Sequence, residues 1–194
     1  SEYAYGFGGS QVYLQPGEEF TVHEMLKAVA IHSANDATVA LAEKIAGSED
    51  VFVSMMNEKA RELGLKNTNY LDCTGLTDEG HYSTAYDIAV LSRELINRYP
   101  KILDYTKIWT DTFRNGQFAL NNTNKLIRHY SGTVGLKTGF TSKAGYCLSA
   151  VVKRDNLTLI SVVLGAPDSN TRFAETRKLQ DYGFANFEHT VLET

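Results

Sequence analysis

Two short motifs place hydroxyl, amide and ammonium groups where they could assist acyl transfer. Ser33 and Asn35 are separated by a single alanine, and Lys137 is followed directly by Thr138 and Gly139. Acyl transfer requires a nucleophile, a base beside it, a proton path to the leaving group and donors that face the developing oxyanion. The side chains of the two motifs could supply the proton path and some of the donors.

The nucleophile and its base have no candidate in the sequence. A serine followed three residues later by a lysine would supply both, because side chains at i and i+3 share one face of a helix. None of the serines has a lysine at that position, and Ser33 has Asp36 there. The two motifs therefore predict most of a catalytic site without the atom that attacks the substrate.

The order of the motifs and the segments around them resemble one known family, the low-molecular-weight D-alanyl-D-alanine carboxypeptidases. These serine penicillin-binding proteins carry a third motif, Ser-x-x-Lys, ahead of the other two. The resemblance covers essentially the whole chain, and its most similar segments are 8–18, 35–43, 80–87, 122–126, 135–141 and 178–184. We therefore interpret residues 1–194 as one partial catalytic domain that lacks the family's N-terminal segment.

The resemblance implies catalytic roles for the first motif. Ser33 would relay a proton to the leaving group. Asn35 would orient the base lysine and donate its amide to the peptide carbonyl of the substrate. From the residues alone, both side chains could instead cap a helix, because serine and asparagine favour helix starts.

The resemblance also implies substrate contacts along and near the second motif. Lys137, besides holding the motif serine, would attract the terminal carboxylate of a D-Ala-D-Ala peptide, and Thr138 would hydrogen-bond to that carboxylate. Gly139 would let the substrate backbone approach the strand, and the Phe140 N–H would form half of the oxyanion hole. Arg172 matches an arginine that some relatives place near the carboxylate. A solvated strand lysine and a surface ion pair are the alternatives for Lys137 and Arg172.

Capping signals and hydrophobic periodicity predict helices first and strands later. Helices are expected from the capping box at 21–24, over 37–46, from 48 to 64, from 84 to 100 and over 171–187. Strands are expected at 136–139, 146–152 and 157–164. This order predicts an α+β fold with a helical cluster and an antiparallel sheet. The resemblance implies the β-lactamase/D,D-peptidase-like fold without its N-terminal strands and nucleophile helix.

Composition and spacing argue against several other classes of protein. The net charge of −4 and the absence of a basic run disfavour a nucleic-acid partner. The longest apolar run, 157–166, is shorter than the ~18 residues of a membrane span. Cys73 and Cys147 form no CxxC pair and the histidines show no ligand spacing. The sequence therefore predicts two reduced cysteines, no metal site and no cofactor.

The resemblance implies peptidoglycan stem peptides ending in D-Ala-D-Ala as substrate and β-lactam antibiotics as covalent ligands, in an extracytoplasmic protein of the cell envelope. A class A β-lactamase is one alternative, but it needs a glutamate in an E-x-x-L-N loop that 68–80 lacks. A non-catalytic peptidoglycan-binding module is another. Because missing strands and a missing helix would expose apolar faces, we expect a second copy or the missing N-terminal segment to complete the chain.

Overall fold

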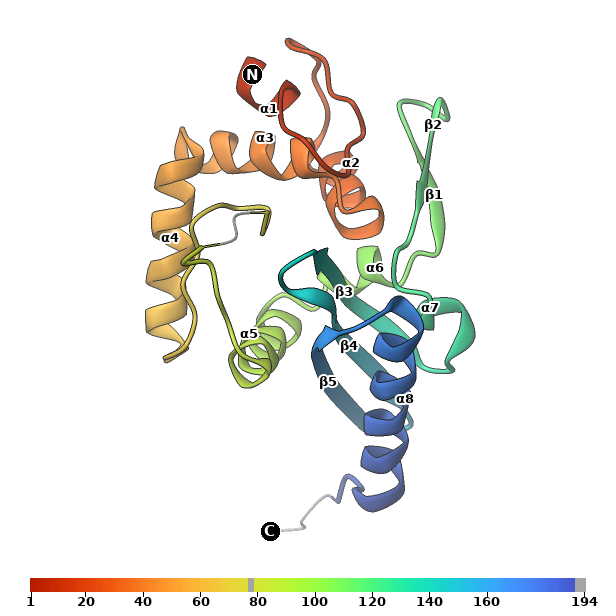
Figure 1. Cartoon of the computed structure of the whole chain (residues 1–194). Coiled ribbons are helices and arrows are strands. Elements are labelled where there is room, and N and C mark those ends of the chain that lie inside the picture. The colour runs from red at the N-terminus through yellow and green to blue at the C-terminus, as the bar shows by residue number, and fades with distance from the viewer. Residues whose placement is uncertain (77–78, 191–194) are drawn as a thin grey trace.

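Helices form most of the first half of the chain, and all the assigned strands lie in the second half, in a computed structural model that describes residues 1–76 and 79–190 (Figure 1). The helices are α1 (Glu2–Tyr5), α2 (Val22–Lys27), the π-helix η1 (Ala28–His32), α3 (Asn35–Ala46), α4 (Glu49–Glu62), α5 (Ala85–Arg98), α6 (Ile102–Thr106), α7 (Leu126–His129) and α8 (Ser169–Asn186). The strands are β1 (Thr110–Phe113), β2 (Phe118–Asn121), β3 (Thr133–Thr141), β4 (Gly145–Arg154) and β5 (Leu157–Ala166). The predicted α+β class is confirmed.

Helices α2, α4 and α5 each begin where a polar side chain caps them. Thr21 accepts a hydrogen bond from the Glu24 N–H, and Glu24 accepts one from the Thr21 N–H, which forms a capping box at α2. Ser48 and Thr84 each accept from a backbone N–H three residues ahead, at the starts of α4 and α5. These bonds satisfy N–H groups that a helix start leaves free. The predicted starts of the three helices are confirmed.

The junction before α3 differs from the prediction. The chain passes from α2 into η1 and then turns at Ser33, whose backbone is left-handed with φ 63° and ψ 38°. Because this turn ends one helix abruptly, α3 begins at Asn35 and not at Ala37. Its N-cap residue is Ala34, which has no side-chain cap. Neither Ser33 nor Asn35 therefore caps the start of α3, whereas Ser33 is the C-cap residue of η1.

A three-stranded antiparallel sheet of order β3–β4–β5 forms the second half of the molecule. The residues 148–152 of the central strand are all buried, so both faces of the sheet are covered. On one face Val151 packs with Ile96 of α5, and on the other Leu148 packs with Phe173 of α8. Figure 1 shows α5 and α8 with the sheet between them.

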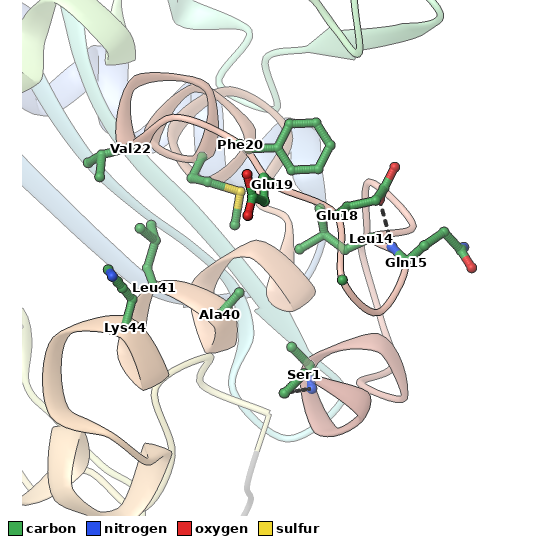
Figure 2. Close-up of a pocket in the computed structure, with 13 residues that line it drawn as sticks. Ser1, Leu14, Gln15, Glu18, Glu19, Phe20, Val22, Ala40, Leu41 and Lys44 are labelled. Atoms are coloured by element: carbon green, nitrogen blue, oxygen red, sulfur yellow. Dashed lines mark hydrogen bonds between the residues drawn. The ribbon is translucent and has the colours of Figure 1, made fainter.

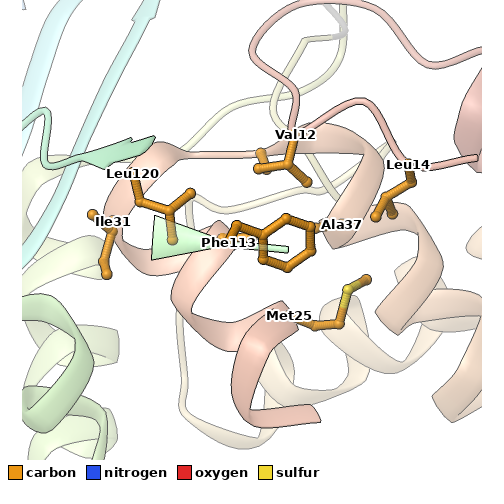
Figure 3. Packing of buried hydrophobic residues seen from close by; sticks show 9 residues of the cluster. Val12, Leu14, Met25, Ile31, Ala37, Phe113 and Leu120 are labelled. Atoms are coloured by element: carbon orange, nitrogen blue, oxygen red, sulfur yellow. The ribbon is translucent and has the colours of Figure 1, made fainter. Parts of the chain in front are cut away.

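A hairpin of β1 and β2, which the sequence analysis did not assign, belongs to the helical half. Its residues Phe113 and Leu120 enter the core formed by Val12, Met25 and Ile31 (Figure 3). The hairpin therefore packs on the helical cluster, and it is not hydrogen-bonded into the sheet of β3, β4 and β5.

The last helix begins two residues earlier than predicted. Asp168 accepts the Thr171 N–H at 2.8 Å and caps α8, so the helix includes Ser169. Over the described residues, no helix has both the length and the apolar character needed to cross a membrane.

Candidate active site

Ser33 lies at the exit of the π-helix, where its left-handed backbone turns the side chain towards the sheet. Its Oγ accepts a hydrogen bond of 2.8 Å from the Nζ of Lys137, a residue 104 positions later. Nearby, the Ser10 hydroxyl donates to the His32 carbonyl at 2.9 Å. A non-glycine residue in the left-handed region is strained, so contacts such as these must hold the turn.

Asn35 is buried and bound to the segment 8–10. Its backbone N–H donates to the Ser10 carbonyl at 2.7 Å, and its Nδ2 donates to the Gly8 carbonyl at 2.9 Å. Gly9 has φ +81°, and a Cβ there would approach Asn35 Nδ2 to 2.5 Å. The segment 8–10 therefore positions Asn35, and only glycine fits at the point of closest approach.

Asp36, which the sequence analysis did not assign to the site, holds the segment that follows residues 8–10. Its carboxylate is fully buried and accepts the N–H groups of Val12 and Leu14 at 3.2 and 3.0 Å. The guanidinium of Arg114, in the β1–β2 turn, donates to the carbonyls of Val12 and Tyr13 at 2.5 and 2.6 Å. The extended segment that supports the motif is therefore bound on both sides. Nothing in the local sequence pattern predicts these pairings.

Lys137 lies on β3, the edge strand of the sheet, opposite Ser149 of β4. Its Nζ donates to Ser33 Oγ and to the Thr138 carbonyl, each at 2.8 Å. Burial, together with the smaller effect of the nearby positive charge of Arg172, lowers the pKa of Lys137 to about 8. Because the ammonium has specific partners and a depressed pKa, the alternative of a solvated strand lysine is wrong.

Thr138 is buried, and its hydroxyl lies 2.5 Å from the hydroxyl of Thr123. Thr123 belongs to the segment after β2, where Asn122 and Asn124 hold the backbone by side-chain hydrogen bonds. The sequence analysis did not assign Thr123 to the site. The sequence signal for this segment was Asn-Thr-Asn, because asparagine side chains often hydrogen-bond to nearby backbone groups and stabilise turns.

Gly139 and Phe140 continue β3 beyond the lysine. Gly139 pairs with Cys147 across the ladder, and the exposed Phe140 ring stacks on Tyr146 with ring centres 4.3 Å apart. Since Gly139 has no side chain, the backbone at this point of the edge strand is open to an approaching ligand.

Arg172 lies in the first turn of α8 and is only 6% exposed. Its guanidinium donates to the carbonyls of Gly139 and Cys147, each at 3.3 Å, and to Ser169 Oγ at 3.2 Å. No acidic partner of Arg172 occurs among the described residues, so the surface ion pair is wrong. The structure places Arg172 against the backbone of β3 and β4, not among the residues that line the pocket.

A pocket of about 530 Å³ brings the two motifs together. Of the residues singled out in the sequence, Ser33, Asn35, Lys137, Thr138, Gly139 and Phe140 line it. Residues 9–10 and 73–76 supply further parts of its wall. The pocket therefore offers a lysine, a serine, a threonine and an amide around one space, which suits an anionic, peptide-like ligand.

A different pocket, of about 410 Å³, lies between α2, α3 and the loop before α2 (Figure 2). Figure 2 shows Leu14, Phe20, Ala40 and Leu41 at its wall with Lys44 at the rim. It contains none of the residues of the two motifs. Its lining mixes apolar side chains with Gln15, Glu18, Glu19 and Lys44, and none of these belongs to the site predicted from the sequence.

The described residues contain no group of three or more histidine, cysteine or acidic side chains placed to hold a metal ion. Within the same residues Cys73 and Cys147 are free thiols. Both line the motif pocket, and the sequence prediction of reduced cysteines agrees with this arrangement.

Comparison with known proteins identifies relatives over nearly the whole chain. The family of D-alanyl-D-alanine carboxypeptidases matches residues 1–168. D-alanyl-D-alanine carboxypeptidase DacF of Bacillus subtilis is 51% identical over 191 residues, which are 97% of this chain and 49% of that protein. The chain thus spans about half the length of this and other curated relatives that it matches.

Two solved structures share the fold. Penicillin binding protein 5 from Haemophilus influenzae superposes with a TM-score of 0.91 at 38% identity, over 96% of this chain and 55% of the other. Penicillin-binding protein D2 from Listeria monocytogenes, in its ampicillin-bound form, gives 0.82 at 34% identity, over 92% and 74%. A class A β-lactamase is therefore not the family to which the sequence and fold point. The chain belongs to the D-alanyl-D-alanine carboxypeptidase family.

Proposed function

We propose that the complete protein is a serine-type carboxypeptidase that removes the terminal D-alanine from peptidoglycan stem peptides through an acyl-enzyme. The observation that carries this proposal is the 2.8 Å hydrogen bond from Lys137 to Ser33 inside the pocket. The nucleophilic serine and its base lysine belong to a Ser-x-x-Lys motif, which these 194 residues lack. Family membership supports the assignment.

The hydrogen bond between Lys137 and Ser33 suits a proton relay. Because the ammonium donates to Ser33 Oγ, the serine is left free to donate its own proton into the pocket. A leaving amine in the pocket would receive that proton, and the ammonium would replace it. Asn35 would hold the peptide carbonyl and orient the base lysine of the complete protein.

The carboxylate of the substrate would bind at the second motif. Lys137 supplies the positive charge and Thr138 a hydroxyl, which can donate outward while it accepts from Thr123. The Phe140 N–H would form half of the oxyanion hole, beside the open backbone at Gly139. Arg172 would not touch the carboxylate. It would hold the Gly139 carbonyl by a hydrogen bond and add positive electrostatic potential to the pocket.

The segments absent from this chain would complete the sheet. Among the described residues β5 pairs only with β4, so its other edge is free. A groove of about 460 Å³ runs between α5 and β5 and includes Tyr86, Ile96 and Ile160. A free edge beside an apolar groove favours addition of a strand. We propose that a strand from the rest of the protein, or from a second copy, occupies it.

The proposed protein acts outside the cytoplasm, at the cell envelope, where its substrate is found, and binds β-lactams as covalent analogues of that substrate. The Listeria relative is described in ampicillin-bound and cefotaxime-bound forms, which supports this ligand class for the family. The competing function is a non-catalytic module that binds peptidoglycan.

Assay of the complete protein separates the two functions. The enzyme should release D-alanine from a peptide ending in D-Ala-D-Ala and ignore the same peptide ending in L-alanine. Mass spectrometry after incubation with ampicillin should find one added acyl group on the serine of the Ser-x-x-Lys motif. Binding of the peptide without D-alanine release or acylation would establish the non-catalytic module.

A further inference from the structure

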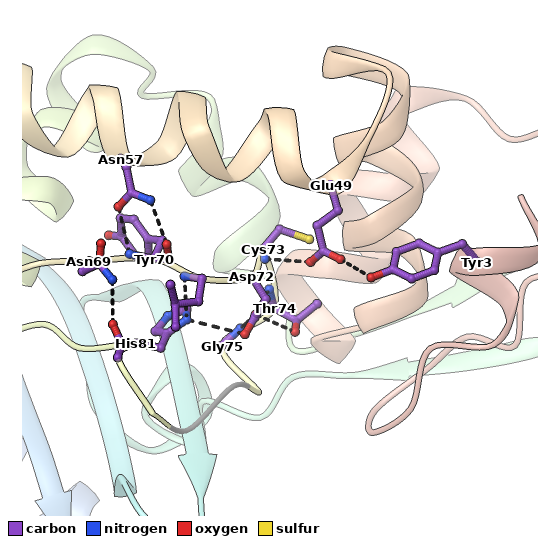
Figure 4. Close-up of polar contacts among 12 residues, drawn as sticks. Tyr3, Glu49, Asn57, Asn69, Tyr70, Asp72, Cys73, Thr74, Gly75 and His81 are labelled. Carbon is purple, nitrogen blue, oxygen red and sulfur yellow. Dashed lines mark hydrogen bonds and ion pairs between the residues drawn. The ribbon is translucent and has the colours of Figure 1, made fainter.

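Beyond the two motifs, the pocket wall at residues 73–76 has an anchor of its own. Helix α4 holds the preceding loop at two places (Figure 4). Asn57 forms a pair of hydrogen bonds with the backbone of Tyr70, at 2.7 and 2.9 Å. Glu49 accepts the N–H of Cys73 at 2.9 Å. Glu49 is thus the anchor next to the pocket, since the wall begins at Cys73.

The loop also has a turn of its own. The Asp72 carboxylate accepts the N–H groups of Thr74, at 2.7 Å, and of Gly75, and also lies 3.5 Å from His81. Gly75 has φ +82°, a conformation that glycine adopts without strain. This turn keeps the shape of the loop, whereas Glu49 is the contact that holds its pocket end, at Cys73, against α4.

Glu49 also contacts the other loop of the pocket. Its second carboxylate oxygen accepts the Tyr3 hydroxyl at 2.5 Å. Tyr3 lies in α1, and residues 6–7 connect this helix to the segment 8–10, which binds Asn35 and contributes to the pocket wall. The hydrogen bond to Glu49 raises the pKa of Tyr3 to about 12. One carboxylate therefore bridges the two chain segments that lead to residues 9–10 and 73–76.

Glu49 has an unusual environment for a carboxylate. It is only 8% exposed, and no lysine, arginine or histidine within the described ranges lies at ion-pair distance. A buried carboxylate without a cation depends on hydrogen-bond donors. Its donors come from two separate segments, so removal of the carboxylate would free both of them.

We propose that Glu49 is a positioning residue that sets the separation of the two pocket-lining loops, 9–10 and 73–76. Its effect on substrate rests on the proposed carboxypeptidase function. A fixed separation holds the peptide in one orientation, so loosening it should weaken binding more than chemistry. The free thiol of Cys73 reports on the same wall without any assay of activity.

The test compares Glu49→Gln with Glu49→Leu in the complete protein. Both changes remove the negative charge, but only glutamine keeps an acceptor for the Cys73 N–H and can donate to the Tyr3 hydroxyl. Glu58→Leu is the matched control, because Glu58 is an exposed glutamate on the same helix. The rate at which iodoacetamide alkylates Cys73 is followed by peptide mass spectrometry.

Iodoacetamide should alkylate Cys73 about tenfold faster in Glu49→Leu than in Glu49→Gln. In Glu58→Leu the alkylation rate of Cys73 should equal that of the unmodified protein. In the D-alanine release assay, Glu49→Leu should raise KM about tenfold and change kcat less than twofold. Equal Cys73 rates in the two Glu49 variants would overturn the positioning role. If that role holds but no D-alanine is released by any variant, the carboxypeptidase function alone fails.

A second variant protects the test against misfolding of Glu49→Leu. Tyr3→Phe removes one donor to Glu49 and leaves the carboxylate in place. It should increase Cys73 alkylation about threefold, because one of the two bridged segments is released. A Cys73 rate equal to that of the unmodified protein would contradict the proposal.

Discussion

Lys137 and Gly139 take their places from the ladder that β3 forms with β4, whereas Ser33 and Asn35 take theirs from hydrogen bonds to distant segments. Strand β3 pairs with β4 from Thr133 to Thr141, and its sheet is covered on both faces. The turn at Ser33 is left-handed and is surrounded by bonds to segment 8–10. Many ladder hydrogen bonds therefore hold the β3 side of the pocket, which we call the sheet wall, whereas a few individual hydrogen bonds hold the turn at Ser33.

This difference predicts different responses to mutation. A residue of the sheet wall can be replaced with loss of its chemistry but little loss of structure, because the neighbouring ladder bonds remain. A residue that supports the turn controls its geometry, because few other contacts can compensate. The following experiments on the complete protein test this contrast.

The largest effect is expected for Lys137→Ala. The substitution removes the donor to Ser33 and the proposed partner of the substrate carboxylate, so kcat/KM should fall by about 10²–10⁴. The melting temperature should change little, because β3 keeps its pairing. Stopped assays of D-alanine release and of penicillin acylation measure the loss, and Lys153→Ala, at an exposed lysine on β4, is the control. Unchanged acylation would exclude Lys137 from the mechanism.

The second effect concerns the support of the turn. Asp36→Ala removes the acceptor of the Val12 and Leu14 N–H groups and leaves both buried, so the free energy of unfolding should fall by about 3 kcal/mol. Denaturant unfolding measures the change. Glu188→Ala, at an exposed glutamate after α8, should leave the midpoint where it was. An equally small change for both variants would show that single contacts do not hold the turn.

The third effect is a pH dependence of substrate binding. The pKa of Lys137 is about 8, so the side chain is an ammonium below that pH and a neutral amine above it. Between pH 7 and 9 the charged fraction falls about tenfold, and KM for the peptide should rise by the same factor. Lys137→Arg, which keeps its charge throughout, should show a flat KM. A flat KM in the unmodified protein would contradict the assignment.

The smallest effect is expected for Thr123→Val. This change removes the hydroxyl that lies 2.5 Å from the Thr138 hydroxyl, and leaves the strand itself intact. The loss of one neutral hydrogen bond should raise KM about fivefold without a change in stability. Thr112→Val, at an exposed threonine of β1, should have no effect on KM. A change in kcat alone would place Thr123 in a different role.

The sequence predicted the regular parts of this structure well. Ser48 and Thr84 identify the starts of α4 and α5 because capping is a local interaction. The strands β4 and β5 follow from apolar runs separated by a polar turn. The lysine motif lies within such a strand, so its position on a sheet could be predicted together with its chemistry.

The turn and the buried charges could not be predicted in the same way. The early start of α3 depends on the left-handed backbone of Ser33, and nothing near that residue in sequence encodes its partner Lys137. Arg172 follows the residue that caps α8 and would normally face solvent, but in the interior its Nη1 donates to the carbonyls of Gly139 and Cys147. Such contacts exist only once distant segments have packed.

Covalent labelling tests the central claim, that these residues form the part of a carboxypeptidase site that surrounds the nucleophile. The complete protein and the 194-residue chain are each incubated with a fluorescent penicillin and separated under denaturing conditions. We expect a labelled band for the complete protein, mapped to the serine of Ser-x-x-Lys, and none for the 194-residue chain. Stoichiometric labelling of the 194-residue chain, mapped to Ser33 or to any other residue of it, would contradict the account.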